Sequence, residues 1–314
     1  MRVTLRRLPD QVMVITGASS GIGLVTARRA ALAGAAVVLA ARNEAALADI
    51  VDDIRRRGGS AVAVTADVGI ESDVARIADT AISTYGRFDT WVNNAGVAMF
   101  GSADQVSVDD MHRLFDTNYW GAVYGSLALA RHIAGRQDGI HGGALIMVGS
   151  TLGNRAIAAQ STYSGSKHAL RGYTDAFRSE QEAKGSPVSV TLVHPGRIDT
   201  PHVEHAHHYP GARRPHARLR QPPETVANAI LRAAQLPVRD VYVGAWSRSA
   251  AVASAIAPGT TDRLVTRYLR WSLRSGRPTT AETTTETRSD EPDHSGTSAL
   301  HYFGSGGRER GRHR

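Results

Sequence analysis

Two side chains four residues apart are suited to acid–base chemistry. Tyr163 and Lys167 lie in residues 162–184, where apolar residues recur at helical spacing, so both are expected on one helix face, a turn apart. A phenol has a pKa of about 10 and is a poor acid or base at neutral pH, but a nearby ammonium lowers that pKa. The pair predicts a tyrosine that exchanges a proton with a substrate; the alternative is an ordinary helix aromatic beside a solvated lysine.

Ser150 adds a hydroxyl to this pair. It follows the apolar run 144–149, which reads as a buried strand. A hydroxyl at the tip of a strand is placed to hold a substrate oxygen, so we interpret Ser150 as a substrate-binding residue.

A glycine-rich turn follows the first predicted strand. Residues 11–16 form a short apolar run, residues 17–23 read Gly-Ala-Ser-Ser-Gly-Ile-Gly, and a helical pattern covers 24–32. Glycines let a ligand approach the backbone, and a helix N-terminus offers N–H groups to a pyrophosphate. The order of elements predicts a dinucleotide site, although the glycine spacing differs from Gly-x-Gly-x-x-Gly.

The end of the second predicted strand, residues 35–41, favours NADP. In dinucleotide folds an acidic residue here accepts the free ribose 2′-hydroxyl, whereas a nearby arginine accommodates a 2′-phosphate. Ala41 occupies the acidic position and Arg42 follows it. We therefore expect NADP(H) to be favoured over NAD(H); the alternative is that Arg42 simply faces solvent at the start of a helix.

These motifs belong to a regular alternation of strands and helices. Further strands are expected at 60–66, 90–96, 144–149, 187–193 and 240–244, with helices at 43–57, 70–85, 108–130, 162–184 and 223–234. The alternation predicts an α/β fold with a single Rossmann-type, doubly wound parallel sheet of about seven strands and helices on both faces.

Two asparagines stand at unusual places in this pattern. Asn94 ends the fourth predicted strand, where ligands bind in this architecture. Asn118 lies in the middle of the long predicted helix, where its amide competes for backbone hydrogen bonds, so a specific role is expected.

The chain continues beyond the predicted sheet. We expect a catalytic domain at 1–244 with a mobile loop at 197–223, a helical extension at 245–275 and a disordered tail at 276–314, which has few apolar residues to bury. The basic helix 261–273 suits a membrane surface, although packing on its own domain is commoner. The loop histidines lack enough carboxylates for a metal site, and none is expected there; they are His202, His205, His207 and His208.

Composition narrows the classes of function. The chain has 314 residues, no cysteine and a formal net charge of +8. Disulfides and thiolate metal sites are excluded, and without a signal peptide or a bilayer-spanning stretch we expect a cytoplasmic protein. The charge suits an anionic partner, but no basic run is interleaved with aromatics, so nucleic acid is not expected.

Together the motifs resemble the short-chain dehydrogenase/reductases, in the branch with Thr-Gly-x-x-x-Gly-x-Gly and Tyr-x-x-x-Lys. The resemblance covers about residues 11–244, and one departure is Gly149, where many relatives have serine. The matching positions follow the family's order: 16–23, Asp67, Val68, 93–96, Asn118, Ser150, Tyr163, Lys167, Pro195, Gly196 and Thr200.

The resemblance implies a role for each catalytic residue. Tyr163 would be the acid/base, Lys167 would lower its pKa and hold the nicotinamide ribose, Ser150 would bind the substrate oxygen, and Asn118 would position Lys167 and a proton-relay water. Cofactor contacts are implied for Tyr163 and Lys167 and for Gly17, Ser19, Ser20, Gly21, Ile22, Gly23, Arg42, Asp67, Val68, Asn94, Ala95, Gly96, Pro195, Gly196, Ile198 and Thr200. Relatives are commonly dimers or tetramers, so a homodimer or homotetramer is expected.

The expected function is an NADP-dependent oxidoreductase that interconverts a ketone or aldehyde and an alcohol, working as a reductase. A moderately apolar substrate is expected, bordered by Val97, Met99, Phe100, Leu152, Ile157 and His194. The alternatives are a catalytically idle nucleotide-sensing protein on the same fold, which the presence of Tyr163 and Lys167 disfavours, and a sugar-nucleotide epimerase or dehydratase, which usually has a different glycine spacing.

Overall fold

The computed structural model describes residues 3–136, 141–200, 206–209, 220–244 and 247–274. The chain divides into two units, 1–276 and 277–314, and all of the described residues belong to the first. The predicted tail at 276–314 and most of the predicted loop at 197–223 lie outside the described residues.

A seven-stranded sheet forms the centre of the first unit. Its strands are β1 (Val12–Thr16), β2 (Ala36–Ala41), β3 (Ser60–Thr65), β4 (Thr90–Asn93), β6 (Gly143–Val148), β7 (Val188–Pro195) and β9 (Asp240–Val243). They lie in the order β3-β2-β1-β4-β6-β7-β9, and all neighbours are parallel. The order reverses between β1 and β4, so a crevice opens at their carboxyl ends. The predicted doubly wound parallel sheet is confirmed.

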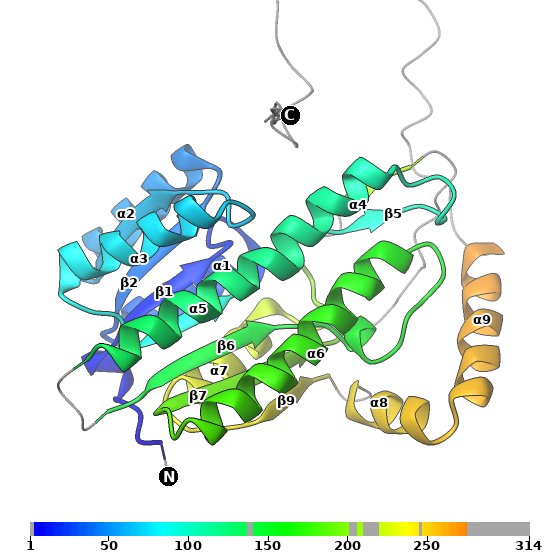
Figure 1. Ribbon diagram of the computed structural model, residues 1–314. Helices are drawn as coiled ribbons and strands as arrows, with labels where there is room; N and C mark the ends of the chain where they lie inside the picture. The colour runs from blue at the N-terminus through cyan, green and yellow to red at the C-terminus, as the bar shows by residue number, and fades with distance from the viewer. Residues whose placement is uncertain (1–2, 137–140, 201–205, 210–219, 245–246, 275–314) are drawn as a thin grey trace, which may run out of the picture. The chain divides into compact units, whose positions relative to one another are not determined.

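Helices cover both faces of this sheet (Figure 1). Helices α1 (Gly21–Leu32), α2 (Glu44–Arg56) and α7 (Pro223–Ala233) bury their apolar residues on one face. Helices α3 (Glu71–Tyr85), α5 (Gly121–Ala134) and α6 (Ser161–Ala183) do so on the other. Because strand side chains alternate between the two cores, the strands read as continuous apolar runs in the sequence.

The long helix predicted at 108–130 is interrupted by a π-helical turn. It starts as α4 (Val108–Phe115), passes through the turn η2 (Asp116–Trp120) and continues as α5. Ser107 caps its start by accepting a hydrogen bond from Asp110 N at 3.1 Å. Such turns occur mostly as single interruptions of α-helices, frequently at functional sites, and this one carries Asn118.

Shorter elements surround the carboxyl ends of the strands. β5 (Met99–Phe100) pairs in parallel with β8 (His207–His208), and the 3-10 turn η3 (Thr151–Gly153) follows Ser150; a further 3-10 turn, η1 (Leu8–Asp10), precedes β1. After β9 come two helices, α8 (Ser247–Ile256) and α9 (Pro258–Arg274), both within the helical extension expected at 245–275; the helix predicted at 261–273 lies in α9. Among the described residues, no helix is long and apolar enough to cross a bilayer.

Candidate active site

The structure brings Ser150, Tyr163 and Lys167 together. Tyr163 and Lys167 lie one turn apart on α6, with Lys167 Nζ 5.9 Å from the centroid of the Tyr163 ring. The Ser150 side chain is hydrogen-bonded to that of Tyr163, and Ser150 Oγ also accepts a hydrogen bond from Leu152 N at 3.1 Å, which caps η3. A hydroxyl, a phenol and an ammonium therefore meet where β6 passes into α6.

Burial dominates the protonation of this group. It raises the pKa of Tyr163, while the hydrogen bond with Ser150 acts in the opposite direction and is the smaller effect. Burial also lowers the pKa of Lys167 from 10.5 to about 8. In the protein alone the net effect on the Tyr163 pKa is therefore upward, because desolvation favours the neutral form of both groups; the lowering by Lys167 stays a prediction.

Asn118 ties the segment after β4 to α6. Its Oδ1 accepts a hydrogen bond from Val97 N at 2.8 Å, and its Nδ2 donates to Val97 O at 3.0 Å and to Ser166 Oγ at 3.1 Å. Ser166 Oγ in turn donates to Tyr163 O at 2.8 Å. Asn118 is thus placed to fix the α6 backbone next to Lys167 by way of Ser166, and the π turn is the feature that aims its amide there.

The glycine turn is packed so tightly that side chains are excluded. A Cβ atom on Gly23 would lie 2.2 Å from Gly17 O, and one on Gly17 would lie 2.8 Å from Ala95 Cα. Asn94 Nδ2 donates to Thr16 O at 2.9 Å and to Gly17 O at 3.2 Å, so the ends of β1 and β4 are joined. The predicted residues Gly17, Gly23, Asn94 and Ala95 therefore pack together at the carboxyl ends of β1 and β4.

The start of α1 fits an anionic group. Ser20 is the N-cap but makes no side-chain capping hydrogen bond, and the first turn holds no acidic residue. Thr200, which follows β7, lies against Gly21, because a Cβ there would be 3.2 Å from Thr200 Cβ. Amides at a helix N-terminus without a capping side chain suit a pyrophosphate, and Ser19 and Ile22 flank Ser20 in this turn.

The remaining predicted cofactor residues follow other strands along the same edge. Asp67 Oδ1 accepts a hydrogen bond from Gly69 N at 2.9 Å, and the neighbouring Val68 packs against Gly121. Gly196 N donates to Val243 O at 2.9 Å. The other members are Arg42, exposed after β2; Gly96, whose Cβ would lie 3.3 Å from Asn118 Oδ1; Pro195, which ends β7; and Ile198, which bridges to Gln221.

Apolar side chains gather around Tyr163. The buried cluster that contains it includes Met99, Phe100 and Leu114, with Val97 and Leu152 packed against it. The pairing of β5 with β8 holds part of this cluster in place, and Phe100 stacks on His208 with ring centroids 5.0 Å apart. The surroundings of the phenol are therefore mainly apolar.

His194 does not face this region as the sequence suggested. Its side chain is 1% exposed, its Nδ1 lies 3.1 Å from Asn154 Nδ2, and its Nε2 lies 2.9 Å from Asp240 Oδ1. Arg171 Nη1 donates to Asn154 Oδ1 at 2.6 Å, which orients the amide so that its nitrogen points at the ring. His194 is a buried link between η3 and β9, and no local sequence pattern connects it with Asp240.

A family model described as short chain dehydrogenase matches residues 11–209. The chain belongs to the short-chain dehydrogenase family. The uncharacterized oxidoreductase YxnA of Bacillus subtilis is 55% identical over 278 residues, covering 88% of this chain and 77% of that protein. This chain is therefore an oxidoreductase of the family, as its motifs predicted.

Two solved structures with the same fold hold related nucleotides. A short-chain dehydrogenase from Burkholderia cenocepacia in complex with NADP has a TM-score of 0.65 and 27% identity, and the match covers 77% of this chain and 100% of the other. An alcohol dehydrogenase from Thermococcus sibiricus complexed with 5-hydroxy-NADP has a TM-score of 0.64 and 25% identity, covering 74% and 94%. In both of those proteins the fold holds an NADP-type nucleotide.

Proposed function

We propose that this protein is an NADP-dependent reductase that converts a ketone or aldehyde with a moderately apolar substituent to the alcohol. The observation that carries the proposal is the convergence of Ser150, Tyr163 and Lys167 beside the glycine turn. The residues also fit the nucleotide: among the described hydrogen bonds, the buried Lys167 Nζ donates only to Val148 O, at 3.1 Å, which leaves N–H groups for ribose hydroxyls.

Each residue would contribute a separate step to the reaction. The nicotinamide, when bound, supplies the hydride that the carbonyl carbon takes up. Ser150 Oγ holds the carbonyl oxygen, and Tyr163 Oη gives that oxygen a proton as the carbon is reduced. Since burial raises the Tyr163 pKa, the phenol is protonated at neutral pH and can donate this proton in the reduction.

The preference for NADP rests on the end of β2. Ala41 offers no carboxylate to a ribose 2′-hydroxyl, and the exposed Arg42 follows it with a side chain suited to a 2′-phosphate. The NADP in the Burkholderia structure and the 5-hydroxy-NADP in the Thermococcus structure support this choice.

A cofactor titration tests the first part of the proposal. NADPH and NADH are titrated against the fluorescence of the four tryptophans in wild type, Arg42→Ala and the control Arg57→Ala, which changes an exposed arginine just after α2. NADPH should bind at least about tenfold more tightly than NADH, and only Arg42→Ala should remove the difference. Equal affinities in wild type would contradict the NADP assignment.

A carbonyl screen tests the chemistry. Tyr163→Phe should lower the reduction rate by about 10²- to 10⁴-fold while NADPH still binds. Tyr173→Phe is the matched control, since it removes a phenol from the same helix, where burial raises the pKa of Tyr173 to about 12. An enzyme that binds NADPH but reduces no carbonyl would favour the idle nucleotide-sensing alternative.

A further inference from the structure

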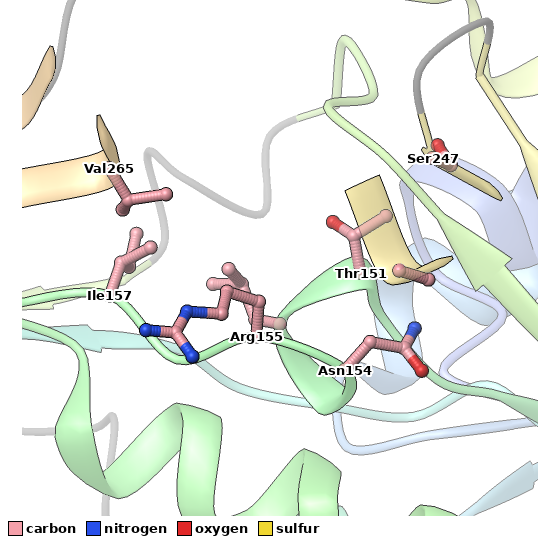
Figure 2. A pocket seen from close by; sticks show the side chains of 8 residues that line it. Thr151, Asn154, Arg155, Ile157, Ser247 and Val265 are labelled. Atoms are coloured by element: carbon pink, nitrogen blue, oxygen red, sulfur yellow. The ribbon is translucent and has the colours of Figure 1, made fainter. Parts of the chain in front are cut away.

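A pocket of about 180 Å³ lies between the loop after Ser150 and the C-terminal extension. Figure 2 shows Val265 of α9 facing Ile157 of the loop, with Thr151 and Ser247 on the other side.

This pocket shares a wall with the candidate active site. Thr151 and Leu152 directly follow Ser150 in η3, and both line the pocket. Leu152 also packs against the apolar cluster that contains Tyr163. The pocket and the candidate site are therefore adjacent through η3.

The lining specifies an uncharged, apolar occupant. Leu152, Ile157, Ala251 and Val265 are aliphatic, and the one charged lining residue, Arg155, forms an ion pair with Asp262 of α9. A net charge in the pocket would lose its hydration against mainly aliphatic walls, whereas hydrocarbon is favoured there. The buried Arg155 Nε, which has no hydrogen-bond partner among the described residues, leaves a donor in the lining for a neutral acceptor. An apolar cavity of about 150 Å³ holds a benzene molecule, so this one has room for a six-carbon ring or a short branched chain.

We propose that the pocket binds the apolar substituent of the carbonyl substrate and that α8 and α9 thereby determine how large this substituent is. The inference rests on the proposed function and adds the part of the chain that selects the substrate.

The extension lies beyond residues 11–209, the part of the chain that the family model matches. The NADP-bound Burkholderia chain is matched over its whole length while covering 77% of this chain, so the remaining part of this chain has no equivalent there. The match with the Bacillus oxidoreductase spans 278 residues, more than the 244 that end just after β9, so it includes part of the extension. A segment that lies outside the family model and is shared with this relative is a suitable place for substrate selection.

The test fills the pocket in the full-length chain. Val265→Phe adds volume inside it, and Leu264→Phe is the matched control, because Leu264 is the adjacent residue and is 64% exposed. The kcat/KM of NADPH-dependent reduction is compared for cyclohexyl methyl ketone and acetone. Val265→Phe should lower the ratio of kcat/KM for cyclohexyl methyl ketone to kcat/KM for acetone at least tenfold, and Leu264→Phe should leave this ratio unchanged. If Val265→Phe alters the melting temperature, Ala251→Leu is used in its place. It fills the pocket from α8 and should lower the ratio in the same way.

A binding measurement separates this inference from the proposed function. The dissociation constant of cyclohexanol with the NADP-loaded protein, measured by calorimetry, should rise at least tenfold in Val265→Phe and stay constant in Leu264→Phe. If wild type reduces no ketone but binds cyclohexanol in this Val265-dependent way, the pocket assignment stands and the reductase proposal fails. If filling the pocket changes neither the ratio nor the dissociation constant, or wild type does not bind cyclohexanol, the pocket assignment is wrong.

Discussion

The turn between β1 and α1 and the extension α8–α9 both border the candidate site, but they are held to the fold in different ways. In the turn, backbone atoms touch backbone atoms, and the position of Gly23 leaves no room for a Cβ. In the extension side chains carry much of the contact, such as Ser247 Oγ, which donates to Val243 O at 2.9 Å, and Asp262, which pairs with Arg155; a backbone hydrogen bond from Ser247 N to Gly244 O at 3.1 Å joins α8 to the end of β9.

This difference decides how readily each region can change. A backbone contact admits one residue type, whereas side-chain contacts can be replaced by others of similar size and polarity. Large apolar groups of the extension also remain exposed, including Ile256 at 79%. We infer that the turn is fixed by its geometry and that the extension is free to differ in sequence while the fold stays the same.

The largest effect is expected in the turn. Gly23→Ala would place a Cβ 2.2 Å from Gly17 O and 2.6 Å from Asn94 Nδ2, and the backbone has to move to admit it. We expect the free energy of unfolding to fall by about 3 kcal/mol and NADPH affinity to fall with it. Urea denaturation and the tryptophan titration measure the two effects.

The control for this change is another glycine on a helix. Gly172 lies in α6, is exposed and has open space where a Cβ would be. Gly172→Ala should therefore raise the free energy of unfolding by about 0.5–1 kcal/mol. Equal effects of the two substitutions would contradict the view that close backbone contact defines the turn.

The same contrast explains how much the sequence could predict. Gly17, Ser150, Tyr163 and Lys167 leave a signature because each sits at a fixed place relative to a strand or a helix turn, and the structure brings them together along the predicted edge of the sheet. The sheet and the order of its helices were predictable for the same reason, since periodicity reports burial.

Other features depend on contacts between distant segments. Asn118 was singled out, but its partners Val97 and Ser166 follow from a π turn that no residue pattern announces. His194 was misplaced because Asp240, which holds its ring, comes from another strand. The helix α8 lies in the helical extension expected at 245–275 but was not delimited as a separate helix, since Ala-rich segments such as 247–256 have little amphipathic pattern.

The second largest effect is expected for Lys167 in α6, because burying its ammonium lowers the free energy of unfolding. The folded pKa of Lys167 is about 8 against 10.5 unfolded, so the unfolded chain holds this proton more tightly and burying the ammonium destabilises the fold below pH 8. That shift corresponds to about 3 kcal/mol, and the lost hydrogen bond to Val148 O offsets about 1 kcal/mol of it.

Lys167→Met should therefore stabilise the cofactor-free protein by about 2 kcal/mol at pH 7. The difference should shrink as the pH rises from 8 toward 10.5, because wild type then loses the charge in its folded state. Denaturation at pH 7 and pH 9.5 measures this, and a difference that grows with pH would show that the sign is wrong.

A smaller effect is expected for the buried link that His194 makes between η3 and β9. Asn154→Ala removes the hydrogen bonds with His194 Nδ1 and Arg171 and should lower the free energy of unfolding by about 1–2 kcal/mol. Asn228→Ala is the control, since Asn228 accepts from Arg29 at an exposed position and should cost less than about 0.5 kcal/mol. Similar losses in the two variants would mean that the buried link does not hold η3.

The smallest effect is expected in the extension itself. Asp262 is 59% exposed, so solvent screens its ion pair with Arg155, and Asp262→Asn should change the free energy of unfolding by less than about 1 kcal/mol. If the pair nevertheless holds α9 over the pocket, the KM for cyclohexyl methyl ketone should rise about two- to threefold while that for acetone stays constant. If Asp262→Asn lowers the free energy of unfolding as much as Gly23→Ala does, the contrast between the two regions is wrong, because the extension is then as integral to the fold as the glycine turn.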